Sequence, residues 1–528
     1  MFFDIVKFKL ICFNNLNSFK IDFVLVSRSE IIYLTDTQRL YDIKSNLRLF
    51  MNRNILLVEP SYKTKFPPLG LMKISSYHKK VGDNVKFIKG INKNIGYECF
   101  WDRIYISTMF TFNWDITIRT IQHYKELAQG DLSRIYIGGI LASLMPKELW
   151  EATGIIPNTG ILNKSGALND DNNLIIDKMI PDYDLFKDSQ QEYSLISDSY
   201  FGYSTRGCPN KCDFCGVKTL EPQFIDYRGI KTYIKRIIQN YGEKVNLVLF
   251  DNNILASKRL DKVVGDLLDL GFEKGAKYSY KNKAGHTFSK LRSVDFNQGI
   301  DARLFKEDKV KLLSKLAINP LRIAFDHIKY EDIYSRRIEL SAKYGIKHLS
   351  NYILYNYDDT PEDLWNRLKI NINLNKKYGL QIYSFPMKYM PLNAKDRSYI
   401  YKPSWNWQFL RGVQRILNVV KGIVMPGEDF FHRAFGENVQ EFKEILHMPE
   451  QIVMYRQKTP QQDEINWINK FRSMTNNEKQ EMLEILNNCN CKKKLTEAIS
   501  KIHNRKIKEI LEYYLSPDYK EKKSSLFN

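Results

Sequence analysis

The sequence predicts an α/β protein whose chain ends in a helical region. Short apolar runs alternate with amphipathic helical stretches over residues 51–165, and the same alternation returns over residues 196–394. Over residues 395–528 only helical periodicity remains. Because alternating strands and helices build parallel sheets, we expect a doubly wound, Rossmann-like domain, then a partial parallel barrel of the TIM type, then a C-terminal helical region.

The first alternation follows an N-terminal stretch without clear organisation. Residues 1–50 are interpreted as an uncertain extension, because Met51 directly precedes the first regular pattern and is a candidate start of the chain. Ile55 to Val58 form an apolar run that is typical of a buried parallel strand. The next stretch has apolar residues at helical spacing and ends at Gly82, which predicts a helix.

Two further strands complete the first domain. Arg103 to Thr108 and Arg134 to Ile140 are apolar runs, and a helical pattern that begins at Trp114 separates them. Residues 166–195 are polar and rich in Asp and Asn, which predicts a linker between the two α/β domains.

The second alternation begins at Tyr200 with a strand that leads into a loop with three cysteines. A helix follows and is closed by Gly242. Later strands are predicted in "VNLVLFDNN", "FNQGIDARL", "LRIAFDHI", "HLSNYILYN" and "LQIYSFPM". Parallel barrels carry their chemistry at the C-terminal ends of the strands, so the polar residues that end these segments are the candidate site residues.

Composition places the chain among ordinary globular proteins. Apolar residues make up 43% and charged residues 27% of the sequence. No apolar run is long enough to cross a membrane, and the start lacks the pattern of a secretory signal. The seven cysteines are clustered and odd in number, which indicates a reducing, cytoplasmic setting rather than a secreted disulfide framework.

The net charge of +20 has two interpretations. It can provide affinity for a nucleic acid. It can also reflect a general abundance of lysine, asparagine and isoleucine, which AT-rich coding produces. We favour the second interpretation, because the basic residues are spread along the chain and form no long basic tract.

Three of the seven cysteines, Cys208, Cys212 and Cys215, lie within eight positions. Each iron of a four-iron cluster needs one outer ligand, normally a thiolate. Three cysteines on one loop therefore leave one iron open for a small chelating molecule. A zinc site with a distant fourth ligand is the alternative chemical interpretation, and chance clustering is the third.

This spacing resembles the motif of the radical S-adenosylmethionine (SAM) superfamily, in which gaps of three and two residues separate the cysteines and an aromatic residue, here Phe214, precedes the last one. The resemblance implies a 4Fe–4S cluster on the three cysteines and SAM chelating the open iron. It also implies reductive cleavage of SAM to a 5′-deoxyadenosyl radical, with electrons from a partner reductase.

The resemblance also suggests residues that contact the cofactor. Asp251 and Asn252 occupy the position of the polar residues that bind the methionyl amino group, although they are equally good helix caps. Gln298 and Arg303 follow a later strand, and Arg303 suits the methionyl carboxylate as well as a surface ion pair. Asp326, in "AFDHI", is a further candidate; the adjacent histidine is expected to be structural.

Residues 51–165 resemble the cobalamin-binding domain that precedes many radical SAM barrels. The cobalt-ligating motif Asp-x-His-x-x-Gly is absent, because the loop after Val58 has no histidine, and His78 is expected at the surface. Cobalamin is therefore an open but not favoured cofactor. The extra cysteines of tRNA methylthiotransferases are also missing, since this region has only Cys99.

Two classes of function are compatible with these features. The favoured one is a radical SAM enzyme, a transferase or oxidoreductase whose substrate is unknown. The other is a nucleic-acid-binding protein with a structural or redox-sensing iron–sulfur cluster. Cys489 and Cys491 are too few for a cluster of their own, and Trp405, Trp407 and Phe409 are expected in the core of the C-terminal region.

Overall fold

The computed structural model describes residues 10–12, 23–26, 31–34, 52–170, 172–187, 193–281, 284–456, 460–489 and 491–515. Its mixed α/β class, with parallel sheets and many helices, is as predicted. Three short antiparallel strands, β1 (Leu10–Cys12), β2 (Phe23–Val26) and β3 (Ile31–Leu34), lie in the N-terminal stretch. The candidate start at Met51 lies outside the described residues.

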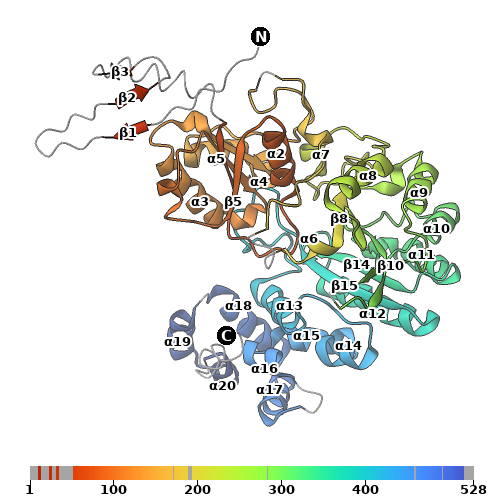
Figure 1. Cartoon of the computed structure of the whole chain (residues 1–528). Helices are drawn as coiled ribbons and strands as arrows, with labels where there is room; N and C mark the ends of the chain where they lie inside the picture. Colours follow the sequence, from red (N-terminus) through yellow and green to blue (C-terminus); the bar gives the residue numbers. More distant parts are fainter. Residues whose placement is uncertain are drawn as a thin grey trace, which may run out of the picture.

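The first α/β unit is a four-stranded parallel sheet in the order β5-β4-β6-β7. Its strands are β4 (Asn54–Glu59), β5 (Asn84–Lys89), β6 (Arg103–Thr108) and β7 (Ile135–Gly139). Its helices are α2 (Leu69–Lys80), α3 (Trp114–Leu127), α4 (Ile140–Leu144) and α5 (Pro146–Thr153). Figure 1 shows these elements in red to orange, with α2 and α3 on either side of β5 in this view.

Strand β4 shows why this sheet is covered on both faces. Its side chains alternate between two cores, because successive residues of a strand point to opposite faces. Ile55 and Leu57 pack with residues of α2, while Leu56 and Val58 pack with residues of α3 and α5. The edge strand β5 was not predicted, because lysines interrupt its apolar residues so that no continuous apolar run forms, and its side chains are only half-buried.

The second α/β unit holds six parallel strands in two three-stranded sheets, ordered β8-β9-β12 and β13-β14-β15. Parallel bridges join β12 to β13 at Val294–Ile318 and Ile300–Ile323. The strands are β8 (Ser199–Gly202), β9 (Asn246–Leu249), β12 (Ser293–Phe296), β13 (Leu321–Ala324), β14 (His348–Tyr355) and β15 (Gln381–Lys388).

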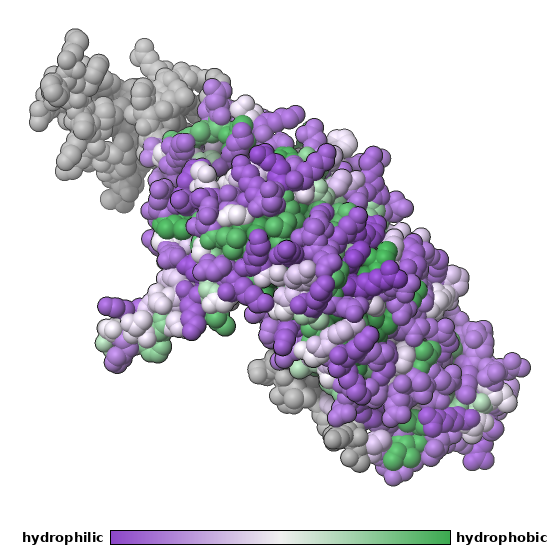
Figure 2. All heavy atoms as spheres, turned by 90° about the vertical axis from the view of Figure 1, so that its right-hand side faces the viewer, coloured by the Kyte–Doolittle hydropathy of each residue, from purple (hydrophilic) through white to green (hydrophobic). Residues whose placement is uncertain are grey.

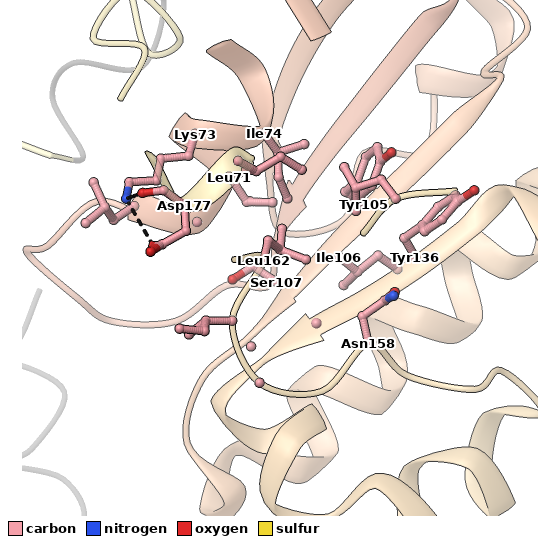
Figure 3. Close-up of a pocket in the computed structure, with 18 of the residues that line it drawn as sticks. Leu71, Lys73, Ile74, Tyr105, Ile106, Ser107, Tyr136, Asn158, Leu162 and Asp177 are labelled. Carbon is pink, nitrogen blue, oxygen red and sulfur yellow. Dashed lines mark hydrogen bonds and ion pairs between the residues drawn. The ribbon is translucent and has the colours of Figure 1, made fainter. Parts of the chain in front are cut away.

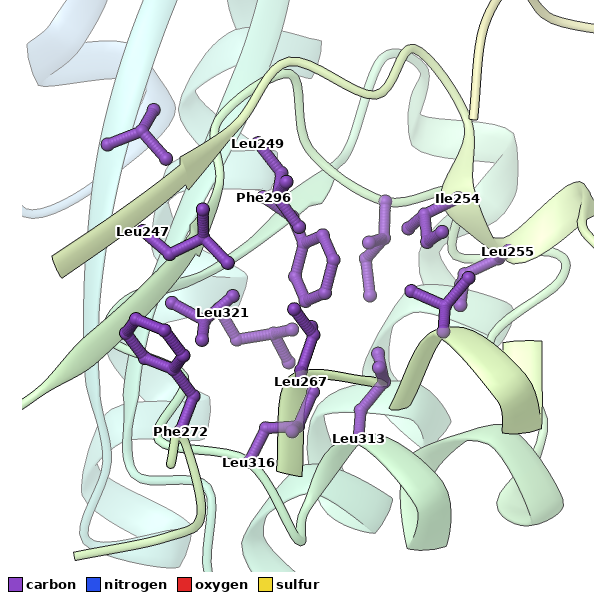
Figure 4. Close-up of a cluster of buried hydrophobic side chains, with 14 of the residues drawn as sticks. Leu247, Leu249, Ile254, Leu255, Leu267, Phe272, Phe296, Leu313, Leu316 and Leu321 are labelled. Carbon is purple, nitrogen blue, oxygen red and sulfur yellow. The ribbon is translucent and has the colours of Figure 1, made fainter. Parts of the chain in front are cut away.

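Helices cover the outer side of these six strands (Figure 1). They are α8 (Ile230–Tyr241), α9 (Leu260–Asp269), α10 (Glu307–Leu313), α11 (Glu331–Lys343) and α12 (Pro361–Tyr378). Two short helices lie elsewhere: α6 (Leu195–Asp198) directly precedes β8, and α7 (Val217–Leu220) follows the cysteine loop and contacts α4. Figure 4 shows the core between the layers, where Leu247 and Phe296 from the strands meet Leu267 of α9 and Leu313 of α10. Burial of these side chains is the main force that holds the helices on the strands.

The segment predicted as a linker packs against the first sheet. Asp170 accepts hydrogen bonds from Arg53 and Arg103 at 2.7–3.0 Å. Asp177 is buried and accepts a hydrogen bond from Arg228 at 2.6 Å. The acidic residues of this segment led to its prediction as a solvated linker. In the structure, Asp170 forms ion pairs with the first α/β unit and Asp177 with the second. The predicted domain boundaries themselves stay predictions.

The rest of the described chain is helical, as expected. It comprises α13 (Trp407–Val419), α14 (Glu428–Phe435), α15 (Val439–His447), α16 (Glu450–Tyr455), α17 (Gln462–Arg472), α18 (Asn476–Asn488), α19 (Lys492–Ser500) and α20 (Arg505–Leu511). These helices share one core with α12 and β14 and lie at the bottom of Figure 1. No helix in the described ranges has the length and apolarity needed to cross a membrane.

The expectation that His78 lies at the surface is wrong. Its side chain is fully buried between Asp83 and Tyr105, with Nδ1 at 2.6 Å from Asp83 and Nε2 at 3.0 Å from the Tyr105 hydroxyl. Since a carboxylate only accepts, Nδ1 carries the proton and Nε2 accepts from Tyr105. Burial lowers the pKa of His78 to about 4, although Asp83 opposes this shift.

We expect this histidine to make the protein less stable in mild acid. Its pKa is lowered on folding, so between pH 6.5 and pH 4 the unfolded chain binds the proton more tightly, and stability falls as the pH falls through that window. The loss at pH 5 is about 2 kcal/mol. Melting temperatures at pH 7.5 and pH 5 should differ less for His78→Gln, which cannot titrate, than for the wild type; an equal difference would contradict this assignment.

Candidate active site

The three cysteines lie on a loop that glycine shapes at its start. Gly207 has a φ of 72°, and a Cβ atom there would lie 2.4 Å from the carbonyl oxygen of Gln223, so only glycine fits. The amide of Cys215 donates to the carbonyl of Cys212 at 3.1 Å, which closes a tight turn. All three thiols are partly exposed and line one cavity.

Asp251 stabilises the start of this loop through hydrogen bonds and does not face the cavity. Its buried carboxylate accepts hydrogen bonds from the amide and hydroxyl of both Ser204 and Thr205, among them one of 2.7 Å from the Ser204 hydroxyl and one of 2.6 Å from the Thr205 hydroxyl. These contacts use its acceptor capacity, and Asp251 does not line the cavity. Asp251, which the resemblance suggests as a SAM contact, thus supports the cysteine loop, and its contact with SAM stays a prediction.

Asn252 and Asn253 follow at the end of β9 and both line the cavity. The amide of Asn252 donates to Glu221 at 2.9 Å, and Glu221 also accepts from the backbone amide of Gly207 at 2.7 Å. Asn253 is almost fully buried; its amide nitrogen lies 3.5 Å from the sulfur of Cys208, and its side-chain oxygen has no hydrogen-bond partner among the described residues. The sequence predicted SAM contacts at Asp251 and Asn252, whereas the side-chain oxygen without a partner in the described residues belongs to Asn253.

The cavity has a volume of about 1380 Å³ and lies at the carboxyl ends of the six parallel strands. This exceeds the roughly 300–1,000 Å³ of a typical small-molecule site. Every strand contributes to it: the cysteines follow β8, the asparagines follow β9, Gln298 and Arg303 follow β12, and Asp326 follows β13. Tyr357 follows β14 and Lys388 ends β15.

Gln298 and Arg303 lie beyond their strand, which ends at Phe296, earlier than the sequence pattern predicted. Gly299, with a φ of 83°, turns the chain there. Arg303 forms an ion pair with Asp301 at 2.8 Å, and Asn210 of the cysteine loop donates to the same carboxylate at 3.0 Å. This network connects the cysteine loop to the end of β12.

Asp326 lines the cavity, and its carboxyl group makes no hydrogen bond to any residue that the structure describes. Burial raises the pKa of Asp326 to about 6, Arg367 and Arg303 oppose the rise, and Asp301 adds to it. The neighbouring His327 also lines the cavity and accepts a hydrogen bond from the backbone amide of Lys329 at 3.0 Å, so its expected structural role stays a prediction. A carboxyl group with this pKa exchanges protons near neutral pH.

Aromatic residues form one wall of the cavity. Phe214, next to the last cysteine, packs edge-on against Tyr357 at 5.5 Å, and Tyr357 contacts Tyr389 and Tyr401 at 4.7 and 4.9 Å. Trp405 is core, but Trp407 lines the cavity, which corrects the expectation that both are core residues. No local sequence pattern indicates this wall, because its members come from distant segments.

Lys388 brings an amine into the same cavity. Its Nζ donates to the carbonyl of Arg397 at 2.6 Å. Burial lowers the pKa of Lys388 to about 8, although Asp396 opposes the shift. Burial also raises the pKa of the Cys212 and Cys215 thiols, and Arg303 opposes this for Cys212.

The donor set fits an iron–sulfur cluster, because three thiols from one loop face one roomy cavity that is lined beyond them by polar strand ends. Within the described residues, no three His, Cys, Asp or Glu side chains converge on a single metal-ion position.

A second, smaller pocket of about 190 Å³ lies beside the first sheet. Figure 3 shows Leu71 and Ile74 of α2, Tyr105 and Ile106 of β6 and Leu162 around it. Lys73 is buried and donates to the backbone carbonyl of Asp177 at 2.7 Å at one side of the pocket. Its walls are mostly apolar, and the pocket is too small for a whole cofactor of drug size or larger.

A cysteine loop and six polar strand ends around one large cavity define a candidate cofactor-dependent enzyme of the α/β class. The chain is similar to solved structures of radical SAM enzymes. One is the methyltransferase TsrM from Kitasatospora setae with cobalamin and a 4Fe–4S cluster bound, at 14% identity over 65% of this chain and 77% of that chain, with a TM-score of 0.47.

Two others are more distant. The cobalamin-dependent SAM radical enzyme OxsB with aqua-cobalamin bound is 12% identical over 69% of this chain and 61% of that chain, with a TM-score of 0.43. SuiB from Streptococcus suis, bound to the precursor peptide SuiA, is 14% identical over 48% and 54%, with a TM-score of 0.29. No family model and no curated protein matches the sequence. The function therefore has to be inferred from the site itself.

Proposed function

We propose that this chain is a radical SAM enzyme, a transferase or oxidoreductase, with Cys208, Cys212 and Cys215 as ligands of a 4Fe–4S cluster. The observation that carries the proposal is the position of these thiols: they share one cavity with the polar ends of six parallel strands, which we infer form a partial barrel. With SAM and an electron from a reductase, the bound cluster supplies the 5′-deoxyadenosyl radical chemistry that the motif implies.

The chain's own residues would position SAM in this cavity. The free side-chain oxygen of Asn253 suits the methionyl ammonium, since an amide oxygen accepts hydrogen bonds from a cation. Arg303, near Cys212, suits the methionyl carboxylate. Asp326 and Lys388 are the groups on the cavity wall that can accept or release a proton from a substrate near neutral pH.

Cobalamin is not part of this proposal. The loop between β4 and α2 holds no histidine, and both ring nitrogens of His78 are already bonded. The described N-terminal residues thus offer no histidine for cobalt at the position that the resemblance requires.

The proposal is tested with protein reconstituted with iron and sulfide without oxygen. SAM and dithionite are added, and 5′-deoxyadenosine and methionine are quantified by mass spectrometry. Equal formation of both products supports the proposal. No product from protein that shows the cluster's absorbance would overturn it and favour the second candidate, a nucleic-acid-binding protein with a structural or redox-sensing cluster.

We expect Asn253→Ala to weaken SAM binding while the cluster is kept. Loss of one hydrogen bond to a charged group costs about 1.5–3 kcal/mol, so the SAM concentration for half-maximal 5′-deoxyadenosine formation should rise about tenfold or more. Asn240→Ala, at an exposed asparagine of α8 that does not line the cavity, is the matched control. Unchanged SAM dependence in Asn253→Ala would remove this residue from the SAM site.

A further inference from the structure

A β-hairpin extends from the second α/β unit at the end opposite the cavity. It consists of β10 (Lys277–Lys281) and β11 (Thr287–Leu291), paired antiparallel and inserted directly before β12. Because β12 runs from the hairpin toward the cavity, the hairpin lies at the amino ends of the strands. A narrow arm stands out from the body in Figure 2, at the level that β10 has in Figure 1.

The base of the hairpin is fixed to the body. Arg292 forms an ion pair with Glu243, and its amide donates to the carbonyl of Ala276 at 2.8 Å. Lys290 pairs with Asp198 at 3.2 Å. Beyond this base both faces are open, since every described residue of the two strands except the half-buried Tyr278 is exposed. An isolated two-stranded hairpin is only marginally stable in water. The exposed residues of this arm therefore add little to the stability of the fold, and a role in binding would account for them.

One face of the arm carries aromatic rings. The ring of Tyr280 lies 6.2 Å from that of Tyr278 and 5.9 Å from that of Phe288, and the ring planes differ by only 19° and 27°. Tyr280 is 36% and Phe288 47% exposed. The cross-strand pair stabilises the hairpin, and both of its rings remain partly exposed, although the Lys290 amine lies 5.5 Å from the centre of the Tyr280 ring. Exposed aromatic rings stack on nucleic-acid bases of any sequence.

The charges of the arm have one sign. Residues 274–292 include Lys274, Lys277, Lys281, Lys290 and Arg292 but no aspartate or glutamate. Lys277, Ser279 and Lys281 of β10 lie on the face opposite the rings, and all three are exposed. Surfaces that bind single-stranded nucleic acid combine basic residues, which contact the phosphates, with exposed aromatic rings, which stack on the bases.

We propose that this hairpin docks single-stranded RNA. A second copy of the chain is a poor occupant, because a basic arm would approach a protein of net charge +20. An acidic peptide would satisfy the lysines but not the row of parallel rings. The hairpin lies away from the cavity, so this surface would hold RNA beside the enzyme's site rather than inside it, and the inference stands independently of the proposed SAM chemistry.

The test uses the full chain and a fluorescein-labelled single-stranded RNA of about 20 nucleotides, followed by fluorescence anisotropy at about 50 and 200 mM KCl. The wild type should bind, and more weakly at the higher salt concentration. Lys277→Glu/Lys281→Glu should weaken binding about tenfold or more and reduce the salt dependence. Tyr280→Ala/Phe288→Ala should weaken binding about tenfold at both salt concentrations.

The control is Lys493→Glu/Lys494→Glu in α19, which makes the same charge change at exposed positions elsewhere and should alter binding less than about twofold. Absence of wild-type binding, or equal binding by the hairpin and control variants, would overturn the proposal. Displacement of the RNA by polyglutamate as efficiently as by unlabelled RNA would contradict it as well and point to an acidic protein instead. The assay needs neither cluster nor SAM, so its failure is distinguishable from failure of the proposed enzyme activity.

Discussion

Each of Cys208→Ala, Cys212→Ala and Cys215→Ala is expected to lower 5′-deoxyadenosine formation at least about a hundredfold, since loss of a residue that only orients a metal ligand already costs about 10–100-fold. The three thiols line the same cavity, and with one thiol missing a second iron of the cluster loses its protein ligand. Iron and sulfide per chain after reconstitution, the visible absorbance of the cluster and the yield of 5′-deoxyadenosine measure the effect.

The chain supplies its own matched controls for this experiment. Cys99 and Cys489 are also free and partly exposed, but neither lines the cavity. Cys99→Ala and Cys489→Ala should therefore keep the cluster and the activity of the wild type. If a cavity variant retained full iron content and activity, or if a control variant lost them, the assignment of the three cluster ligands would be wrong.

The elements that sequence alone predicts are those with a strong local pattern. The run Ile55 to Val58 is fully buried because β4 lies inside a sheet with a helix layer on each face. Strand β5 and the hairpin β10–β11 were missed for the opposite reason: their side chains are half-buried or exposed, so no apolar run marks them. A continuous apolar run reports burial on both faces of a strand, so a half-buried or exposed strand has none and shows at most an alternation of polar and apolar residues.

In the candidate site too, sequence predicts only the residues that form a local pattern. Three cysteines that are close in sequence can be recognised without a structure. Within the polar run that follows β9, however, only the fold decides that Asp251 turns back to hold the cysteine loop while Asn253 keeps a free oxygen. Tyr357 and Lys388 reach the cavity from the ends of different strands, and no local pattern links them.

Arg367 of α12 is a buried cation that holds together the chain segments beside the cavity. Its side chain is fully buried and donates to the backbone carbonyls of Asp363, Phe325, Asp326 and Leu354 at 2.7–3.2 Å. It also donates to Asp359 at 2.6 Å. One guanidinium therefore joins the ends of β13 and β14 to the start of α12, directly beside the cavity.

Arg367→Met is expected to destabilise the protein by about 3–5 kcal/mol, because it leaves the buried Asp359 carboxylate and several carbonyls without their donor. Urea unfolding of the chain without cofactors measures this loss. Arg505→Met, at a side chain that is 92% exposed and paired with Glu509 within one helix, should cost less than about 1 kcal/mol.

The double variant Arg367→Met/Asp359→Asn distinguishes the buried charge from simple loss of packing. Since it removes the unpaired carboxylate as well, it should recover part of the stability that Arg367→Met loses. A double variant less stable than the single variant would show that the Asp359 carboxylate is held by Trp405 and the backbone amide of Tyr357 without help from the guanidinium. Recovery would establish that the unpaired Asp359 carboxylate, rather than the lost volume of the arginine side chain alone, causes part of the destabilisation.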